Sequence, residues 1–109
     1  MLPSERVACK LGFKTKIPEG YYAQLVPRSG LALWEGLTIL NTPATIDPNY
    51  RGEWLAIVQN NSNNHSTLEI GDRICQLIIR KKTDSSFKAV SSLEETKRNE
   101  GGFGSSGRK

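Results

Sequence analysis

Hydrophobic and polar residues alternate in short runs along most of this chain, with the period of about two residues that indicates β-strands. Val, Ile, Thr and Trp, which favour extended backbone, are frequent in these runs. No segment carries a long apolar stripe with the helical period of about 3.6 residues. Strands are therefore expected within RVACKLGFKTKI (6–17, broken at Leu11-Gly12), YYAQLVPR (21–28), LTIL (37–40), EWLAIVQN (53–60), STLEI (66–70) and RICQLIIRK (73–81).

Turn-forming residues separate these runs: Pro18-Glu19-Gly20, Ser29-Gly30, Asp47-Pro48-Asn49, the Asn-rich stretch 60–64, and Gly71-Asp72. Only SGLALWEG (29–36) and LEETKRN (93–99) have the composition for a turn or two of helix. Many short strands at close spacing predict an all-β domain, either a β-sandwich or a jelly roll.

Length and charge narrow the class of protein. A chain of 109 residues fits one small domain with a thin stability margin, which oligomerisation commonly remedies. The net charge of +4 is scattered, and Arg80-Lys81-Lys82 reads as a solvated strand end rather than a nucleic-acid patch. A mildly positive surface suits a small anionic ligand.

The two cysteines bear on the compartment. Cys9 and Cys75 fit neither a disulfide framework nor a metal-site spacing, so free, buried thiols are expected. Such thiols indicate a reducing cytosol. The sequence shows no apolar leader and no membrane-spanning stretch. The expectation is a soluble protein of the cytoplasm, or of the host-cell cytoplasm for a viral or phage protein.

Four polar segments carry candidate chemistry: PRSGLA (27–32), NTPATIDPNYRGE (41–53), GDRICQL (71–77) and EGGFGSSGRK (100–109). The first offers the guanidinium of Arg28, the hydroxyl of Ser29 and exposed backbone N–H groups, a set suited to phosphate. In the second, the carboxylate of Asp47 stands three residues before the ring of Tyr50. The third places Gln76 in a strand. Composition alone makes the fourth a flexible end that binds nothing, although a Gly-rich segment can also fold over a ligand.

Taken in order, these segments resemble four of the five motifs of the trimeric dUTPase family. PRSGLA resembles motif two, TIDPNYRGE motif three, GDRICQLI motif four and GGFGSSG motif five. The resemblance extends to the connecting segments LPSER, IPEGYYAQL and GLTILN, and so covers nearly the whole chain. It implies the family's jelly roll, the β-clip, over residues 1–97 without the usual N-terminal strand. Residues 98–109 would form a mobile Gly-rich arm that closes over a neighbouring subunit's active site.

The resemblance also implies an activity. Such an enzyme converts dUTP and water to dUMP and pyrophosphate, with Mg²⁺ held by the triphosphate and waters rather than by direct protein ligands. It lowers dUTP and supplies dUMP for thymidylate synthesis. The family is a homotrimer with shared active sites, and no nucleic-acid or membrane partner is expected.

Carried over by position, the resemblance makes Asp47 the general base that deprotonates the attacking water. Tyr50 would pack against the deoxyribose and leave no room for a 2′-hydroxyl. The other substrate-binding positions would be Arg28, Ser29, Gly30 and Gln76 on the phosphates, Asn41 on uracil together with hairpin backbone groups, Ile46 beside them, Arg98 on the γ-phosphate, Phe103 stacked on uracil, and Gly104, Ser105 and Ser106 in the closing arm.

Each residue also has an ordinary structural explanation. Asp47-Pro48-Asn49 could be an Asx-type turn, Tyr50 a plain strand residue, and Arg51 with Glu53 a surface ion pair. Trp34 and Trp54 are interpreted as packing or subunit-interface residues rather than ligand contacts.

The sequence departs from the family pattern in one large way: the first motif, Ala-Gly-Tyr-Asp-Leu, has no counterpart. The strand could be encoded upstream of Met1, another segment could replace it, or the chain could be a weakened or inactive relative. Ala44 and Asn99 also stand where glycine is common. A non-catalytic nucleotide-binding relative is therefore the alternative. A dCTP deaminase, which shares the fold, is disfavoured because Ile57 stands where that family places its catalytic glutamate.

Overall fold

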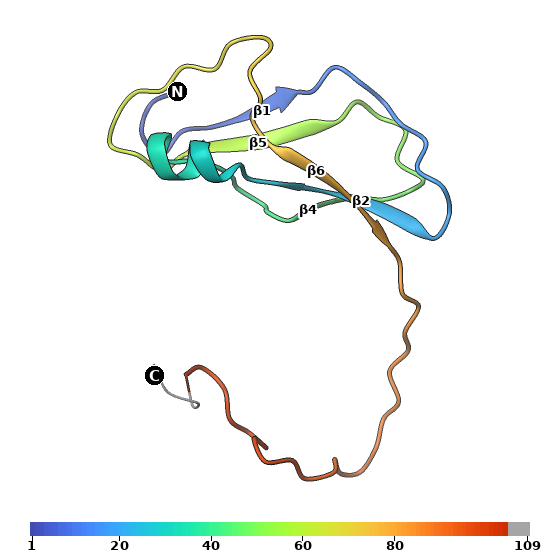
Figure 1. Ribbon diagram of the computed structural model, residues 1–109. Helices are drawn as coiled ribbons and strands as arrows, with labels where there is room; N and C mark the ends of the chain where they lie inside the picture. Colours follow the sequence, from blue (N-terminus) through green and yellow to red (C-terminus); the bar gives the residue numbers. More distant parts are fainter. Residues whose placement is uncertain (105–109) are drawn as a thin grey trace.

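The computed structural model describes residues 1–104 of the chain, and these form a small β-sandwich followed by an extended segment (Figure 1). The elements are β1 (Arg6–Lys10), β2 (Tyr21–Val26), the single π-helical turn η1 (Leu31–Glu35), β3 (Leu37–Ile39), β4 (Ala44–Ile46), β5 (Leu55–Asn60) and β6 (Gln76–Lys81). They make two three-stranded antiparallel sheets, in the orders β1-β5-β3 and β4-β2-β6. The expected all-β sandwich with at most a short helix is confirmed.

Buried side chains from both sheets meet in one core. Its members are Ile17, Ala23, Leu25, Leu37, Ile39, Ala44, Trp54, Ala56 and Val58. The alternating residues of β2 and β5 point inward, which is the pattern that the sequence predicts for strands with one buried face. The core is thin, with small Ala residues at several of its positions.

The two tryptophans differ. Trp54 is buried in the core, where its ring lies 5.0 Å from that of Phe13 and its Nε1–H donates to Thr15 Oγ1 at 3.0 Å. The packing interpretation is therefore confirmed for Trp54. Trp34 on η1 is 81% exposed, so it does not pack inside its own chain. Its place in a subunit interface stays a prediction.

Two of the expected strands are absent from the part of the chain that the structure describes. After β1 the chain turns at Gly12, whose φ is +87°, and residues 13–17 form no strand. The backbone on either side of Gly12 exchanges one pair of hydrogen bonds with Trp54 instead of forming a ladder. Residues 66–70 pack Leu68 against the core, and the N–H of Glu69 is taken by the carboxylate of Asp72 at 2.8 Å. In both segments the apolar alternation reflects core packing rather than strand pairing. Strand β4 was not expected, because it is only three residues long and follows Pro43.

Among residues 1–104, one polar side chain is fully buried, that of Asn60. The amide of Asn60 at the end of β5 donates to the carbonyls of Met1 at 3.2 Å and Asn64 at 2.8 Å. Its Oδ1 accepts from the backbone N–H of Ser62 at 3.0 Å and from the Ser62 hydroxyl at 2.7 Å. Every polar atom of this amide is paired, as burial requires. Asn60 thereby ties the N-terminus to the loop that follows β5.

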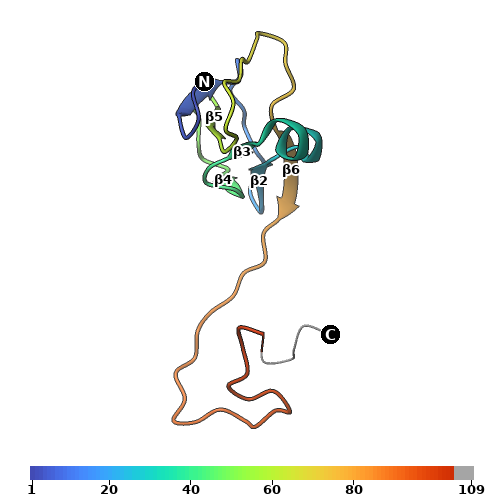
Figure 2. The same cartoon turned by 90° about the vertical axis from the view of Figure 1, so that its left-hand side faces the viewer.

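Beyond β6 the chain leaves the sandwich. The N–H of Lys82 donates to Gly20 O at 2.7 Å, and residues 83–104 then run away from both sheets (Figures 1 and 2). Side chains such as Phe87, Leu93 and Phe103 are exposed along this stretch. Residues 93–99 form no helix. Within residues 1–104, no helix is long and apolar enough to cross a membrane.

Candidate functional site

Strand pairing brings the first and third polar segments, PRSGLA and GDRICQL, into one corner. Val26 at the end of β2 pairs with Gln76 at the start of β6, and the Gln76 side-chain amide donates to Pro27 O at 3.3 Å. A cavity of about 310 Å³ opens beside them and is lined in part by Arg28, Asp72 and Arg73. We call residues 27–30 with residues 73–76 the Arg28 corner. Sequence reasoning missed Asp72 and Arg73 as lining residues, although they lie four and three residues before Gln76 in the same segment.

The loop of the Arg28 corner continues directly into η1. The N–H of Ala32 donates to Arg28 O at 3.0 Å, so the corner and the helical turn share a hydrogen bond. Ser29 and Gly30 are exposed. Gly30 has φ −64°, and a Cβ at this position would meet nothing within 4 Å. The fold itself therefore does not require glycine there.

Asp47 and Tyr50 lie in a turn that follows β4, which we call the Asp47 corner (residues 47–53). The N–H of Tyr50 donates to the main-chain carbonyl of Asp47 at 3.1 Å. Because this bond uses the backbone oxygen, the turn does not consume the exposed carboxylate of Asp47. The Tyr50 hydroxyl donates to Glu53 O at 2.9 Å, and Arg51 Nη1 donates to Pro48 O at 2.5 Å. Arg51 and Glu53 are thus tied to backbone groups, with the Glu53 carboxylate accepting from Gly12 N at 3.2 Å.

The two corners stand at opposite ends of the same sheet. Ile46 pairs with Ala23 on β2, so Asp47 follows at the Tyr22 end of that strand. Arg28 lies six residues farther along, beyond the other end of β2. At the rise of a strand this is a separation of about 20 Å along the sheet. One chain therefore does not bring the Asp47 carboxylate to the Arg28 corner.

Two further candidates sit between β3 and the Asp47 corner. Asn41 is exposed in the turn after β3, where the N–H of Thr42 donates to Ile39 O at 3.1 Å. Ile46 is half-buried and packs against the core. Asn41 therefore precedes strand β4 and Ile46 ends it, on the segment that also carries Asp47.

The candidate residues of the arm lie apart from both corners. Arg98 Nε donates to Gly101 O, and the N–H of Gly101 donates back to Arg98 O at 2.9 Å, which closes a local turn. Phe103 is fully exposed and Gly104 has φ +86°. Figure 2 shows this part of the arm well away from the sandwich. Ser105 and Ser106 lie outside the described residues.

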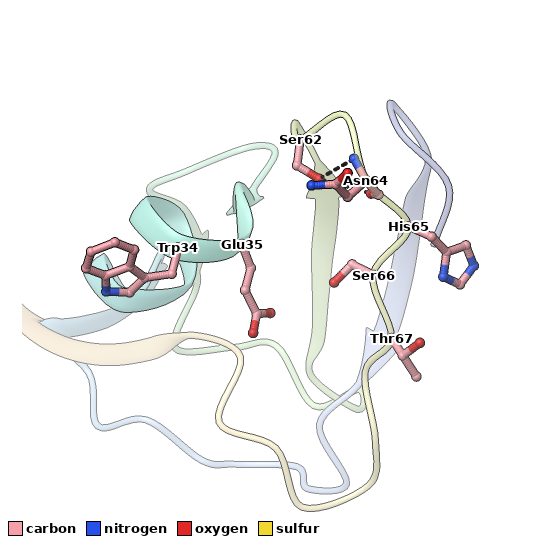
Figure 3. A pocket seen from close by; sticks show the side chains of 7 residues that line it. All are labelled: Trp34, Glu35, Ser62, Asn64, His65, Ser66 and Thr67. Atoms are coloured by element: carbon pink, nitrogen blue, oxygen red, sulfur yellow. Dashed lines mark hydrogen bonds between the residues drawn. The ribbon is translucent and has the colours of Figure 1, made fainter.

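A separate polar cavity of about 360 Å³ opens between η1 and the loop after β5 (Figure 3). Its lining residues are Trp34, Glu35, Ser62, Asn64, His65, Ser66 and Thr67. In Figure 3 the Trp34 ring points away from the loop. None of the candidate site residues lines this cavity.

The two thiols are free, and both are partly buried. Burial raises the pKa of Cys9 and of Cys75, and the Cys9 thiolate raises the pKa of Cys75 further. Neither thiol is therefore an activated nucleophile. Across residues 1–104, no three His, Cys, Asp or Glu side chains gather as a metal site.

Known proteins resemble this chain closely in sequence and in fold. The family model described as dUTPase matches residues 1–107. The deoxyuridine 5'-triphosphate nucleotidohydrolase of Finegoldia magna is 48% identical over 105 residues, covering 96% of this chain and 73% of that protein. The protein of the same name from Fusobacterium nucleatum subsp. nucleatum is 47% identical over 104 residues, covering 95% of this chain and 71% of that one.

The fold agrees with that of a solved dUTPase structure. The structure of Staphylococcus bacteriophage 80alpha dUTPase with dUPNHPP superposes with a TM-score of 0.80 at 28% identity, over 98% of this chain and 79% of that one. The family model spans residues 1–107, and each of the two relatives matches at least 95% of this chain at 47–48% identity. The chain belongs to the dUTPase family.

Proposed function

We propose that this protein is a dUTP diphosphatase, which hydrolyses dUTP to dUMP and pyrophosphate. The observation that carries the proposal is identity of almost half the residues, over nearly the whole chain, to proteins named for this reaction. The activity would lower dUTP and supply dUMP for thymidylate synthesis. Two free thiols fit a reducing compartment, so we place the reaction in the cytoplasm.

Asp47 is the general base in this proposal. Its carboxylate is exposed in a turn that is closed by backbone groups, so it can accept the proton of a water molecule. The water oxygen forms a bond to the α-phosphorus while the bond from that phosphorus to the α–β bridging oxygen breaks. Pyrophosphate leaves with the electron pair. Aiming the water and neutralising the phosphate oxygens supply most of the catalysis in such transfers.

The Arg28 corner binds the phosphate chain. Arg28 supplies a charged donor, Ser29 a hydroxyl, and Gly30 an exposed backbone N–H. The open space at Gly30 supports this role, because the absence of a Cβ lets a phosphate approach the backbone closely. Gln76, already hydrogen-bonded to Pro27 O, adds a neutral donor at the same corner.

Recognition of the nucleoside falls to the segment around β4 and to the arm. Asn41 and backbone groups near Ile46 read uracil, and the Tyr50 ring packs on the deoxyribose. Phe103 stacks on the base when the arm closes, with Arg98 on the γ-phosphate and Gly104 and Ser105 in the closing backbone. Phe103 is exposed in the structure, which leaves its ring available for stacking.

The complete site needs more than one subunit, and we propose the homotrimer of the family. The separation of about 20 Å between the two corners along β2 supports shared sites. One subunit would supply the Arg28 corner, a neighbour the Asp47 corner, and the arm would close from a neighbour as well. The thin core and the exposed Trp34 fit a chain that buries more surface on assembly.

Magnesium fits this arrangement as a partner of the substrate. Among the described residues, no three carboxylate, imidazole or thiolate side chains lie close enough together to bind a metal ion. Mg²⁺ is commonly coordinated by substrate phosphate oxygens and several water molecules. Bound along the triphosphate, it would neutralise charge on the phosphate oxygens. Arg28 and Gln76 would then hold the phosphate chain beside it.

The test is hydrolysis in H₂¹⁸O with Mg²⁺ present. We expect pyrophosphate release from dUTP, far slower release from UTP or dCTP, and ¹⁸O in dUMP. Label in pyrophosphate instead would contradict attack at the α-phosphorus. Binding of dUTP in calorimetry with no products after long incubation would overturn the enzymatic proposal itself.

A further inference from the structure

Gly52 lies directly beneath the ring of Tyr50. A Cβ built at Gly52 would stand 2.5 Å from the Tyr50 hydroxyl oxygen, 2.7 Å from Cζ and 3.1 Å from Cε1. A side chain at residue 52 would fit only if the Tyr50 ring moved. The φ angle of Gly52 lies outside the left-handed region, so backbone conformation is not the reason for glycine at this position.

The Tyr50 ring is held over Gly52 from its far end. Its hydroxyl reaches across Gly52 and donates to Glu53 O at 2.9 Å. The other end of the turn is fixed by Arg51, which donates to Pro48 O at 2.5 Å and to Tyr50 O at 3.3 Å. The backbone of the turn is thereby closed on both sides, and the ring's position depends on the space that Gly52 leaves.

We propose that Gly52 is a positioning residue that sets sugar specificity by seating the Tyr50 ring. The inference rests on the proposed function, in which that ring packs on the deoxyribose. With glycine at residue 52, the hydroxyl end of the Tyr50 ring lies closer to the backbone than it could beside a residue with a side chain. The position of its face then determines whether a 2′-hydroxyl has room beside it.

A substitution at Gly52 should move the ring rather than unfold the chain. Tyr50 is 42% exposed, so its side chain can rotate into solvent when a methyl group occupies its seat. The atoms that the new Cβ would meet belong to the far part of that side chain and not to the backbone. Gly52→Ala should therefore reduce sugar specificity more than it reduces the stability of the fold.

The first experiment compares kcat/KM for dUTP and for UTP in the wild type and in Gly52→Ala, with Mg²⁺ present. A pocket that excludes one added hydroxyl by shape discriminates by about 100-fold. We expect Gly52→Ala to lower the dUTP-to-UTP ratio by about tenfold, through weaker use of dUTP and better use of UTP. An unchanged ratio in a folded Gly52→Ala protein would overturn the inference.

A double-mutant cycle distinguishes displacement of the Tyr50 ring from a general loss of activity. Tyr50→Ala should lose the discrimination by itself, and Gly52→Ala added to it should change the ratio no further, because there is no ring left to displace. Independent, additive losses would contradict the inference. Gly20→Ala is the matched control: glycine at φ +87° with nothing within 4 Å should lose stability to backbone strain yet keep the wild-type ratio.

Crystal structures of the wild type and of Gly52→Ala test the seat without any turnover. We expect the ring above residue 52 in the first and rotated away in the second. A ring in the same place in both would refute the inference even if dUTP is hydrolysed. If the wild type failed to hydrolyse dUTP, the proposed function would be refuted. The two crystal structures would still show whether Gly52 determines the position of the Tyr50 ring.

Discussion

The Arg28 corner and the Asp47 corner are held in shape by different kinds of interaction. The first depends on a six-residue antiparallel register between β2 and β6, which also contributes to the sandwich. The second depends on contacts within seven residues: a turn bond, the Arg51 bonds and the ring of Tyr50 over Gly52. In the proposed mechanism, phosphate binding would thus depend on the sheet, whereas base catalysis and sugar selection would depend on local side-chain geometry. Single substitutions should therefore alter chemistry at the Asp47 corner without disturbing the Arg28 corner.

The largest expected effect is that of removing Asp47, the proposed general base. Asp47→Asn keeps the shape and the backbone turn but removes the proton acceptor, so kcat should fall by about 1,000-fold. KM should change little, because the Arg28 corner is intact. Pyrophosphate release measures both parameters. Wild-type turnover in this variant would show that Asp47 is not the base.

Mixing two inactive proteins tests whether the corners work across subunits. Asp47→Asn chains keep the Arg28 corner, and Arg28→Ala chains keep the Asp47 corner. In trimers reassembled from equal amounts, about a quarter of the sites would combine the two intact corners, so about a quarter of wild-type activity should return. The unmixed parents, taken through the same unfolding and refolding, are the controls. A mixture as inactive as its parents would place both corners of a site in one chain.

Removal of the arm would leave both corners in place but would remove the segment that is proposed to close over the substrate. A protein lacking residues 99–109 should remain folded and bind dUTP, with kcat about 100-fold lower, because the substrate is no longer enclosed and aligned. Calorimetry measures binding, sedimentation measures assembly, and product release measures the rate. A kcat equal to that of the wild type would show that the arm has no role in catalysis.

The smallest effect concerns the phosphate side. Gln76→Ala removes one neutral donor and the bond to Pro27 O, which should raise KM for dUTP by about tenfold while kcat stays near wild type. Gln59→Ala is the matched control, since this glutamine lies on β5 between Arg6 and Thr38, in the other sheet. Equal effects of the two substitutions would show that Gln76 acts only through the fold.

Local patterns in the sequence were enough to find most strands, because alternation directly reports which face of a strand is buried. The inward positions Ala23 and Leu25 on β2, and Ala56 and Val58 on β5, follow from that alternation. The same signal misled at 66–70, where Leu68 is buried by a loop rather than a strand.

Other features depend on contacts that no local pattern records. The distance between Asp47 and Arg28 follows from the register of β4 on β2, which sequence spacing does not reveal. The seat of the Tyr50 ring depends on its side-chain rotamer and on Gly52. The family motifs name the candidate residues of the site, whereas these contacts show how one chain separates them.

The sixteen residues from 82 to 97 join the last strand to the predicted arm, and their length has a thermodynamic consequence. A flexible chain of this length has a root-mean-square span of about 20–24 Å, similar to the distance between the two corners. Within an assembled trimer, closure of the arm would then be an intramolecular event at a local concentration in the millimolar range. The rate of arm closure would then be the same in dilute and in concentrated protein. The length of residues 82–97 would determine that rate.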